Sequence, residues 1–565
     1  MIYSIRLIML RAAQIVVILL TTSFSLQVLS EEHKVAIASA HPLATAAGFE
    51  ILAKGGNVFD AAVAVSAALA VVEPFSSGLG GGAYWLLHRE KDAFEVLIDG
   101  REKAPMAAHK NMYLDKEGKV IDKLSLDGPL SAAIPGMPAG LVHLSKQYGK
   151  LPLSESLLPA IRYAQTGFAV GERYLKLLKF REAVIHHYPE TAAIFLDKGK
   201  LPERFSLLRQ PDLAKTLSNL ANSGREGFYN GSTADKLVES VNKAGGIWTK
   251  NDLESYQIIE RKPVTGVYKG LKITSTGSSS SGGVVLIEAL NILAGYDLSK
   301  MDELTRKHLI TEAMRRAYHD RSLYLGDEDF INIPLKRLLS EDYAAGLRST
   351  IRLDKALPSE LMSGQIELQT EGLNTTHFSI IDDEGNRVAS TLSINFPFGS
   401  GFVAEGTGVI LNNEMDDFDS YPGATNGYGL IGGIANCIEP GKRMLSSMTP
   451  TFLESDTDIA VLGTPGGSRI SSMVLLAALD FEKGNGPESW VKVPRYHHQF
   501  MPDVIEYEEG ALSEPEITSL KSMGHQSKKV RYPYGDMQAV LLNKKTKSLL
   551  AASDQRGEGR AVVGK

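Results

Sequence analysis

The sequence predicts an α+β fold or a layered α/β/α arrangement, in which helices and strands occur in separate runs. Two apolar helical segments near the start of the chain precede a glycine-rich turn and two strand-like segments. A helical middle region follows, and a polar/apolar alternation typical of a β-hairpin comes after it. At 565 residues and 43% hydrophobic composition, the chain is long enough to bury a large core.

The first 30 residues have the layout of a secretory signal. Arg6 and Arg11 precede an apolar stretch over residues 12–20, and small and polar residues follow through Ser30. This stretch is shorter than the about 20 residues of a membrane-spanning helix. We therefore expect residues 1–30 to be removed from an exported protein, periplasmic or secreted, with an uncleaved membrane anchor as the alternative.

The chain after the leader begins with two helices and two strands. Helical periodicity covers residues 45–54 and 59–72, and strand-like segments cover residues 84–87 and 94–99. The run Ser-Ser-Gly-Leu-Gly-Gly-Gly at 76–82 lies between them, and no Gly-Lys-Ser/Thr follows it. Because the order is helix then strand, the reverse of a phosphate-binding loop, we predict a tight turn where backbones approach closely.

The middle and the second half contain three further predicted elements. Residues 302–325 have the spacing of a helix with a buried stripe, and residues 274–283, which contain the serine run 278–281, read as a flexible loop that enters another helix. Residues 376–382 and 388–395 read as two strands, joined by the turn Asp-Glu-Gly-Asn at 383–386. The chain thus predicts a β-hairpin that starts immediately after Thr375.

Thr375 is the candidate nucleophile. A threonine hydroxyl attacks poorly near neutral pH unless a base accepts its proton, and a free α-amine on the same residue is one such base. An α-amino group has a pKa of roughly 7.7 to 8.0, near the working pH. This chemistry requires cleavage between Asn374 and Thr375; an ordinary threonine-rich surface hairpin is the simpler interpretation of the motif alone.

Several motifs together resemble the γ-glutamyltranspeptidase family. The run Asn-Thr-Thr-His-Phe-Ser at 374–379 is followed by Gly385-Asn386, Thr391, Asn395 and Phe398-Gly399-Ser400. Four more matches occur in the family's order, at Arg101-Glu102, 412–417 (Asn-Asn-Glu-Met-Asp-Asp), 445–448 (Leu-Ser-Ser-Met) and 465–468 (Pro-Gly-Gly-Ser).

The resemblance implies an N-terminal-nucleophile hydrolase with a four-layer αββα sandwich. Members cleave themselves into two subunits, which here are a large subunit 31–374 and a small catalytic subunit 375–565 that form a heterodimer. The poorly periodic residues 353–374 are then the tail that swings away after cleavage. The family places the serine run 278–281 near the catalytic cleft, whereas the residues alone are equally typical of a solvated turn.

The resemblance also assigns catalytic roles. Ser393 lies two residues after Thr391 on the returning strand, so both side chains point to one face, where Ser393 bonds the amine or oxygen of Thr375. The family usually has threonine at 393, a difference that affects rate more than reaction type. Gly466 and Gly467 offer backbone amides to an oxyanion. A helix predicted from Ser468 to about residue 481 directs its positive end toward them.

A γ-glutamyl donor carries an α-carboxylate and an α-ammonium, so its pocket needs both kinds of partner. Arg101, Ser446 and Ser447 are expected to bind the carboxylate, and the acceptors for the ammonium are Asn395, Glu414 and Asp417. A glutaryl group lacks the ammonium, so the two carboxylates favour a glutamyl donor. Residues 422–442 resemble the lid loop of many bacterial members, with Tyr428 as the gating aromatic residue.

These features predict an autoprocessing γ-glutamyltransferase and glutathione hydrolase that transfers the glutamyl group to water, amino acids or dipeptides. The alternatives are a related acylase, acting on glutaryl-cephalosporins or poly-γ-glutamate, and an unprocessed exported binding scaffold. We expect no cofactor and no metal, because the adjacent pairs His186-His187 and His497-His498 lack metal-ligand spacing. The net charge of −6 without a polybasic run argues against nucleic acid, and the sole cysteine, Cys437, excludes an intramolecular disulfide.

Overall fold

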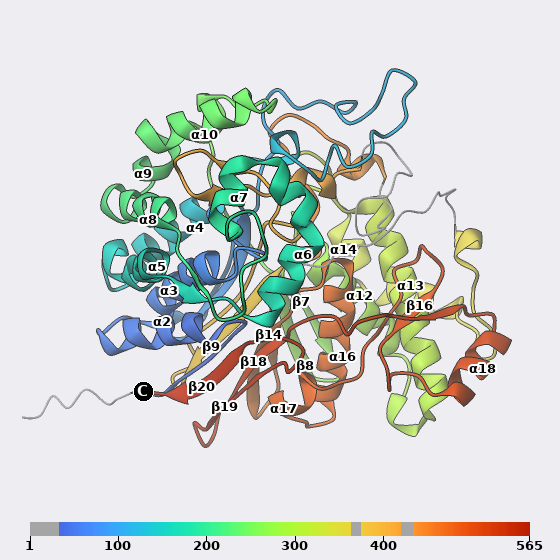
Figure 1. Ribbon diagram of the computed structural model, residues 1–565. Coiled ribbons are helices and arrows are strands. Elements are labelled where there is room, and N and C mark those ends of the chain that lie inside the picture. Colours follow the sequence, from blue (N-terminus) through green and yellow to red (C-terminus); the bar gives the residue numbers. More distant parts are fainter. Residues whose placement is uncertain (1–32, 363–374, 420–432) are drawn as a thin grey trace, which may run out of the picture.

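Two large β-sheets lie in the middle of the molecule, with helices on their outer sides (Figure 1). The computed structural model describes residues 33–362, 375–419 and 433–565. Asn374, Tyr428 and the predicted leader lie outside these residues. So does most of the predicted tail, whose described part ends in a 3-10 turn at Ser359–Met362.

The first sheet has seven strands in the order β20-β1-β9-β10-β2-β3-β6. Every pairing between neighbours in it is antiparallel. Its strands are β1 (Val35–Ser39), β2 (Gly82–Arg89), β3 (Phe94–Gly100), β6 (Ile259–Arg261), β9 (Thr376–Asp382), β10 (Arg387–Ser393) and β20 (Arg560–Gly564).

The second sheet has six strands in the order β19-β18-β14-β13-β8-β7. They are β7 (Val264–Tyr268), β8 (Leu271–Ser275), β13 (Thr451–Glu454), β14 (Asp458–Gly463), β18 (Gln538–Asn543) and β19 (Leu549–Ser553). Shorter strands outside both sheets are β4 (Phe168–Ala169), β5 (Leu207–Leu208), β11 (Val403–Ala404), β12 (Val409–Ile410), β15 (Tyr496–His497), β16 (Ile505–Tyr507) and β17 (Ser527–Lys529).

The two sheets pack face to face through a narrow apolar cluster. Along β1, Ala36 and Ala38 point into this cluster with Phe452 and Val461 of the other sheet. The alternate residue Ile37 points to the opposite face, into the core under the N-terminal helices. Each sheet is therefore buried on both faces, and the polar residues of the central strands, such as His377 and Ser379 on β9 and Thr391 on β10, are buried with it.

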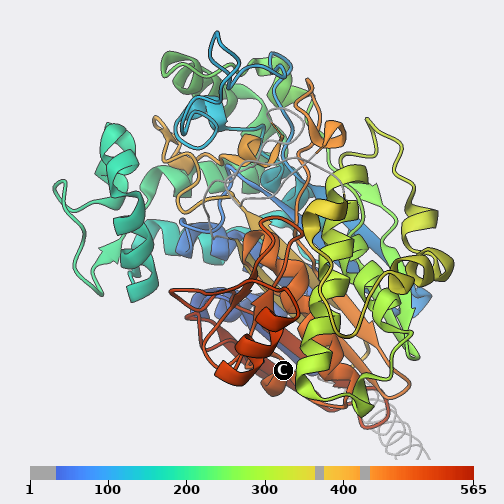
Figure 2. The same cartoon turned by 90° about the vertical axis from the view of Figure 1, so that its right-hand side faces the viewer.

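Helices cover the outer face of each sheet (Figure 1). The seven-stranded sheet is covered by α2 (Pro42–Ala53), α3 (Val58–Val72) and α4 (Met137–Tyr148), and the six-stranded sheet by α12 (Gly282–Leu293) and α16 (Ile470–Glu482). Further out, α5 (Leu153–Thr166) packs on α3, α8 (Pro211–Ser223) on α5, and α13 (Glu303–Tyr324) on α12. In Figure 2, the yellow-green helices and the red C-terminal segment lie next to each other, and both contribute to one core.

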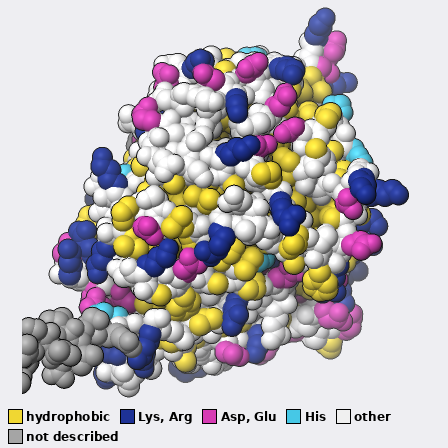
Figure 3. Space-filling view, turned by 60° about the vertical axis from the view of Figure 1, so that its left-hand side comes forward, with side chains coloured by type: hydrophobic (Ala, Val, Ile, Leu, Met, Phe, Trp, Pro, Cys, Tyr) yellow, Lys and Arg dark blue, Asp and Glu magenta, His cyan; other side chains and the backbone are white. Residues whose placement is uncertain are grey.

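The remaining helices are peripheral. They are α6 (Glu172–His187), α7 (Pro189–Phe195), α9 (Glu226–Tyr229), α10 (Gly231–Lys243), α11 (Lys250–Glu254), α14 (Leu335–Leu338), α15 (Glu341–Ser349), α17 (Pro487–Trp490) and α18 (Glu514–Ser522). None of the helices within the described ranges has the length and apolar character needed to cross a bilayer. On the face drawn in Figure 3, basic and acidic side chains are interspersed.

Most predicted elements are confirmed, with small shifts at their ends. The helices expected at 45–54, 59–72 and 302–325 are α2, α3 and α13, and the expected hairpin is β9 with β10. Asn57 begins α3 with a capping box that includes Asp60. The helix expected from Ser468 starts two residues later, at Ile470, because residues Gly467–Arg469 form a 3-10 turn first.

The glycine-rich turn is confirmed as a place of close backbone approach. A Cβ atom on Gly80 would lie 2.1 Å from the carbonyl oxygen of Ile410, and one on Gly81 would lie 2.1 Å from that of Ser393. Any larger residue would push these backbones apart. The turn thereby packs the start of β2 against the end of β10, next to the candidate nucleophile.

Candidate active site

Thr375 immediately precedes the central strand β9 and is 3% exposed. In the antiparallel pair of β9 with β10, Thr376 lies opposite Leu392. Continuing this register by one residue places Ser393 opposite Thr375. The hairpin predicted from the sequence therefore brings the candidate nucleophile and its candidate hydroxyl partner to the same end of the sheet.

A small pocket at this end collects most of the predicted site residues. Its volume is about 20 Å³, room for about one water molecule. Its walls come from loops that follow β3, β10, β12 and β14. The lining residues are Arg101, Thr375, Ser393, Asn395, Glu414, Asp417, Ser446, Ser447, Met448, Gly467, Ser468 and Ile470. Of the predicted residues that the structure describes, Gly466 alone is missing here, and it lines an adjacent pocket.

Arg101 forms a buried ion-pair cluster at the end of this pocket. Its Nη1 lies 2.5 Å from Oε2 of Glu414, and its Nη2 lies 2.5 Å from Oδ2 of Asp417. A third carboxylate, that of Glu102, lies 3.4 Å from Nη1. One guanidinium thus faces three carboxyl groups, and the positive charge of Arg321 also acts on Asp417.

The pKa values of this cluster reflect its burial. Desolvation raises the pKa of Glu414 to about 7, although the positive charge of Arg101 opposes the shift. Burial likewise raises the pKa of Asp417 and of Glu102 above their ordinary values. Near neutral pH the cluster can therefore hold a proton that a bound ammonium group would displace.

The loop after β10 is shaped by two polar contacts. The hydroxyl of Ser393 accepts a hydrogen bond from the backbone amide of Asn395 at 2.7 Å. Asn395 has a φ of +71°, in the left-handed region that asparagine tolerates better than most residues. Its side-chain amide donates to the carbonyl oxygen of Asn413 at 3.0 Å. These contacts turn the chain so that Ser393 and Asn395 both face the pocket.

Gly466 and Gly467 adopt backbone conformations that favour glycine, with φ of +144° and +57°. Thr464, two residues before Gly466, donates from Oγ1 to the carbonyl oxygen of Pro465 at 3.0 Å and accepts from the backbone amide of Asp536 at 3.0 Å. A peptide carbonyl and the following N–H point in opposite directions. Thr464 therefore sets the direction of the Gly466 N–H, a contact that the sequence analysis did not find.

The serine run 278–281 is not a solvated turn, because all four side chains are buried. The backbone amide of Ser446 donates to the carbonyl oxygen of Ser279 at 2.9 Å, and that of Ser281 donates to the carbonyl oxygen of Ser446 at 2.9 Å. The hydroxyl of Ser279 bonds Tyr84 at 2.6 Å. The run thus lies beside the site and holds Ser446 and its neighbour Ser447 in place.

Asn412 and Asn413 hold the loop that carries the acidic residues. The side-chain oxygen of Asn412 accepts from the backbone amide of Glu414 at 2.9 Å, and its nitrogen donates to the carbonyl oxygen of Gly80 at 2.6 Å. Asn413 accepts from the amide of Phe396 at 3.0 Å. These asparagines connect the acidic loop to the glycine turn and to the loop after β10.

The histidines near the site and elsewhere have structural contacts. His377 is fully buried, bonds Thr391 at 2.8 Å, and has a pKa lowered to about 3 by burial. This contact fixes its ring against β10. Within the described residues, His308, Glu312 and His525 are the one group with metal-ligand atoms close together. Arg315 and Arg316 already bind Glu312, at 3.1 and 2.7 Å.

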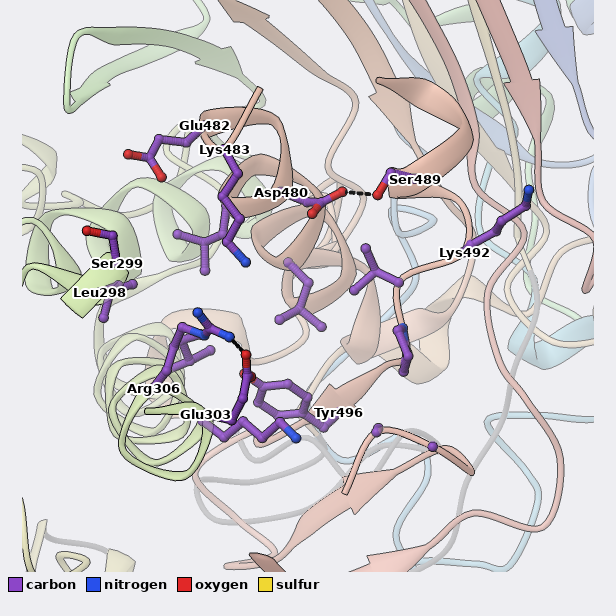
Figure 4. Close-up of a pocket in the computed structure, with 18 residues that line it drawn as sticks. Leu298, Ser299, Glu303, Arg306, Asp480, Glu482, Lys483, Ser489, Lys492 and Tyr496 are labelled. Atoms are coloured by element: carbon purple, nitrogen blue, oxygen red, sulfur yellow. Dashed lines mark hydrogen bonds and ion pairs between the residues drawn. The ribbon is translucent and has the colours of Figure 1, made fainter. Parts of the chain in front are cut away.

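A larger cavity of about 570 Å³ lies away from Thr375, between α13, α16 and the segment around Tyr496 (Figure 4). Arg306 points toward Glu303, and Asp480 accepts a hydrogen bond from Ser489. None of its lining residues is shared with the Thr375 pocket. Size alone therefore does not identify the reactive site in this molecule.

Comparison with known proteins agrees with the motifs. The model of the Gamma-glutamyltranspeptidase family matches residues 44–564. The glutathione hydrolase proenzyme of Escherichia coli (strain K12) is 38% identical over 534 residues, which cover 94% of this chain and 91% of that one. The corresponding proenzyme of Pseudomonas sp. (strain A14) is 42% identical over 493 residues, covering 86% and 85%.

Solved structures with the same fold come from two kinds of enzyme. A cephalosporin acylase from Bacillus halodurans superposes with a TM-score of 0.81 at 27% identity, covering 94% of this chain and 96% of that one. The γ-glutamyltranspeptidase of Helicobacter pylori superposes with a TM-score of 0.56 at 42% identity, covering 58% of this chain and 96% of that one. From its matched length and its level of identity to the relatives, this chain belongs to the γ-glutamyltranspeptidase family.

Proposed function

We propose that this protein is an autoprocessing γ-glutamyltransferase and glutathione hydrolase with Thr375 as its nucleophile. The single observation that carries the proposal is the position of Thr375, at the start of a central strand and in the same small pocket as Arg101, Glu414 and Asp417. The pocket joins a nucleophile to a set of charges suited to an amino acid head group.

Processing begins with attack of the Thr375 hydroxyl on the carbonyl carbon of Asn374. The peptide C–N bond breaks as the ester C–O bond forms, and the nitrogen becomes the α-amine of Thr375. Water then hydrolyses the ester, which leaves a carboxylate on Asn374 and restores the hydroxyl. The new amine is the base for later turnovers, since its pKa of roughly 7.7 to 8.0 lies near the working pH.

In turnover, the Thr375 oxygen attacks the γ-carbonyl carbon of the donor, and the α-amine accepts the hydroxyl proton. The backbone N–H groups of Gly466 and Gly467 stabilise the oxyanion, and α16 directs its positive N-terminal end toward the same region. The proton passes to the leaving amine as the C–N bond breaks. Water or an amine acceptor then attacks the γ-glutamyl ester on Thr375.

The donor's head group is assigned to the ion-pair cluster. Its α-carboxylate replaces a carboxylate of the protein on Arg101 and accepts from Ser446 and Ser447, and its α-ammonium binds Glu414, Asp417 and Asn395. The added ammonium takes the place of the proton that burial allows Glu414 and Asp417 to hold. A zwitterion fits this cluster better than a dianion or a neutral group does.

We assign the fold as the four-layer αββα sandwich of N-terminal-nucleophile hydrolases, shared by two fragments, 31–374 and 375–565. Both sheets combine strands from before and after the proposed cut, so a heterodimer holds together after cleavage. The superposition with the Helicobacter pylori chain covers 96% of that chain but 58% of this one. This share is close to that of residues 31–374 and supports a two-fragment architecture.

The remaining parts of the proposal follow the sequence. Residues 1–30 direct export to the periplasm or the medium, and Tyr428 belongs to a lid over the donor. Glutathione is the donor, in line with the names of the two relatives, and amino acids or dipeptides are acceptors beside water.

A glutaryl-cephalosporin acylase is the second candidate, favoured by the superposition with the Bacillus halodurans enzyme. A glutaryl donor has no ammonium, and would leave the carboxylates of Glu414 and Asp417 uncompensated. The decisive experiment measures glutamate released from glutathione by the purified protein, alongside hydrolysis of γ-glutamyl and glutaryl anilides. Release from glutathione and from the glutamyl anilide supports the transferase; turnover of the glutaryl anilide alone supports the acylase.

A further inference from the structure

The cavity of about 570 Å³ between α13 and α16 lies between the two proposed subunits (Figure 4). Its volume is within the usual range for small-molecule sites. Residues 298–310 of its wall precede the proposed cut, whereas residues 476–511 follow it. We refer to it as the α13–α16 cavity. A molecule bound there contacts both proposed subunits.

One part of the wall of the α13–α16 cavity is apolar. Its side chains come from the first turns of α13, from the second half of α16 and from the chain on either side of β16. They include Leu298, Ile310, Leu476, Leu479, Val493 and Ala511. An apolar part of a ligand that contacts these side chains leaves water, which favours binding.

Tyr496 adds a buried polar group to the same cavity. Its side chain lines the cavity and is 5% exposed (Figure 4). Among the residues that the structure describes, none forms a hydrogen bond with its hydroxyl group. Burial raises the pKa of Tyr496, so the hydroxyl keeps its proton and is able to donate it in a hydrogen bond. Because buried polar groups usually have a partner, this hydroxyl points to a ligand that accepts.

Two cationic side chains reach the cavity from different helices. In Figure 4, Lys483 at the end of α16 and Arg306 of α13 both extend into the space between the helices. Arg306 is paired with Glu303, but a guanidinium has five N–H donors and retains some of them for a ligand. Lys483 has no carboxylate partner in the described ranges of the chain. Its ammonium group is therefore available.

The other charged side chains of the wall are already paired. Asp480 accepts hydrogen bonds from Ser489 at 2.5 Å and from Asn485 at 2.8 Å. The remaining pairs are Glu482 with Lys269 at 3.5 Å, Lys307 with Glu516 at 2.6 Å and Lys492 with Glu488 at 2.9 Å. What the cavity offers a ligand is therefore a set of donors, two of them cationic, next to an apolar surface. A carboxylate with an apolar body matches this combination.

We infer that the α13–α16 cavity binds an apolar monocarboxylate, such as a medium-chain fatty acid. The carboxylate accepts from Lys483, Arg306 and Tyr496, and the alkyl chain packs against the apolar part of the wall. The cavity shares no lining residue with the Thr375 pocket, so this inference does not depend on the proposed function.

The test is a calorimetric titration of the purified protein with octanoate, decanoate and 1-octanol. We expect one site per chain. Decanoate should bind about tenfold more tightly than octanoate, because two more methylene groups are buried. Octanoate should bind about tenfold more tightly than 1-octanol, which has the same chain length and no charge.

Two variants test the donors. Lys483→Gln removes the available ammonium group, which is exposed, so decanoate binding should weaken by about fivefold and 1-octanol binding should not change. Tyr496→Phe keeps the ring and removes only the hydroxyl group, and decanoate binding should weaken by about tenfold.

Lys545 provides the matched control, because it is another exposed lysine and does not line the cavity. Lys545→Gln changes the net charge as Lys483→Gln does, and it should bind decanoate as tightly as the parent. The inference would be overturned by a parent without saturable decanoate binding, by equal affinities in the parent and in Lys483→Gln, or by equal losses in the two lysine variants. None of these results bears on the release of glutamate from glutathione.

Discussion

Arg101 and Glu414 form a buried ion pair, with Nη1 and Oε2 2.5 Å apart. In the sequence they lie on opposite sides of the proposed cleavage site. Each side chain is about 1% exposed. Arg101 belongs to the proposed large subunit and Glu414 to the proposed small subunit. Removing one partner of a buried ion pair is costly, because it leaves the other charge buried and unpaired. The contact therefore ties the two fragments together while it shapes the donor pocket.

Substitutions of Thr375 test whether its hydroxyl is needed for self-cleavage. Thr375→Ala lacks the hydroxyl that attacks Asn374, so we expect one uncut chain without transferase activity. Thr375→Ser keeps a hydroxyl, and we expect it to cleave itself. A denaturing gel reports both results, and two fragments from Thr375→Ala would rule out Thr375 as the residue that starts processing.

Binding of the donor through its ammonium group is expected to depend on Asp417. Asp417→Asn keeps the volume but removes a charge, and a hydrogen bond to a charged group contributes about 1.5 to 3 kcal/mol. The KM for a γ-glutamyl anilide is thus expected to rise about tenfold or more, with normal self-cleavage. Asp416→Asn is the control, because Asp416 accepts from Ser125 at 2.7 Å and does not line the pocket. Equal KM values for the two variants would refute the pocket assignment.

The pH dependence of donor binding follows from Glu414. Burial raises the pKa of Glu414 to about 7, so its carboxyl group becomes neutral as the pH falls below that value. A neutral group attracts the donor ammonium less, and the KM of the parent is expected to rise up to about tenfold from pH 8 to pH 6. Glu414→Gln has a higher KM at pH 8 but lacks this rise. The amine of Thr375 titrates in both proteins, so an identical pH profile would show that Glu414 does not contribute.

Thr464 is expected to act on the rate and not on donor binding. Its hydroxyl bonds the carbonyl oxygen of Pro465 and thereby directs the N–H of Gly466. An oxyanion donor contributes about 3 kcal/mol to the transition state, so partial misalignment in Thr464→Val should lower kcat by about tenfold or more with little change in KM. Thr464→Ser restores the hydroxyl and should recover most of the rate. A change in KM alone would place Thr464 outside the oxyanion site.

Local patterns in the sequence predicted the elements that begin and end at the site. The alternation around the turn at 383–386 predicted β9 and β10, and the glycine run at 76–82 predicted a tight turn with close backbone approach. These features depend on neighbouring residues, so periodicity and turn chemistry reveal them. The family motifs then indicated which loops meet at Thr375.

Contacts between distant segments were not predictable in the same way. The serine run 278–281 is polar enough for a solvated turn, but backbone pairing with Ser446 buries it. The bond from the Asp536 amide to Thr464 joins residues 72 positions apart and leaves no periodic signal. The ion pairs of Arg101 with Glu414 and Asp417 likewise form only when the loops come together. The same holds for the placement of Gly466 and Gly467 in two adjacent pockets.

The most direct measurement is the mass of each polypeptide in a preparation that releases glutamate from glutathione. We predict a fragment whose mass equals that of residues 375–565 and whose first residue is Thr375 with a free amine. An active preparation in which residues 374 and 375 are still joined would contradict the account.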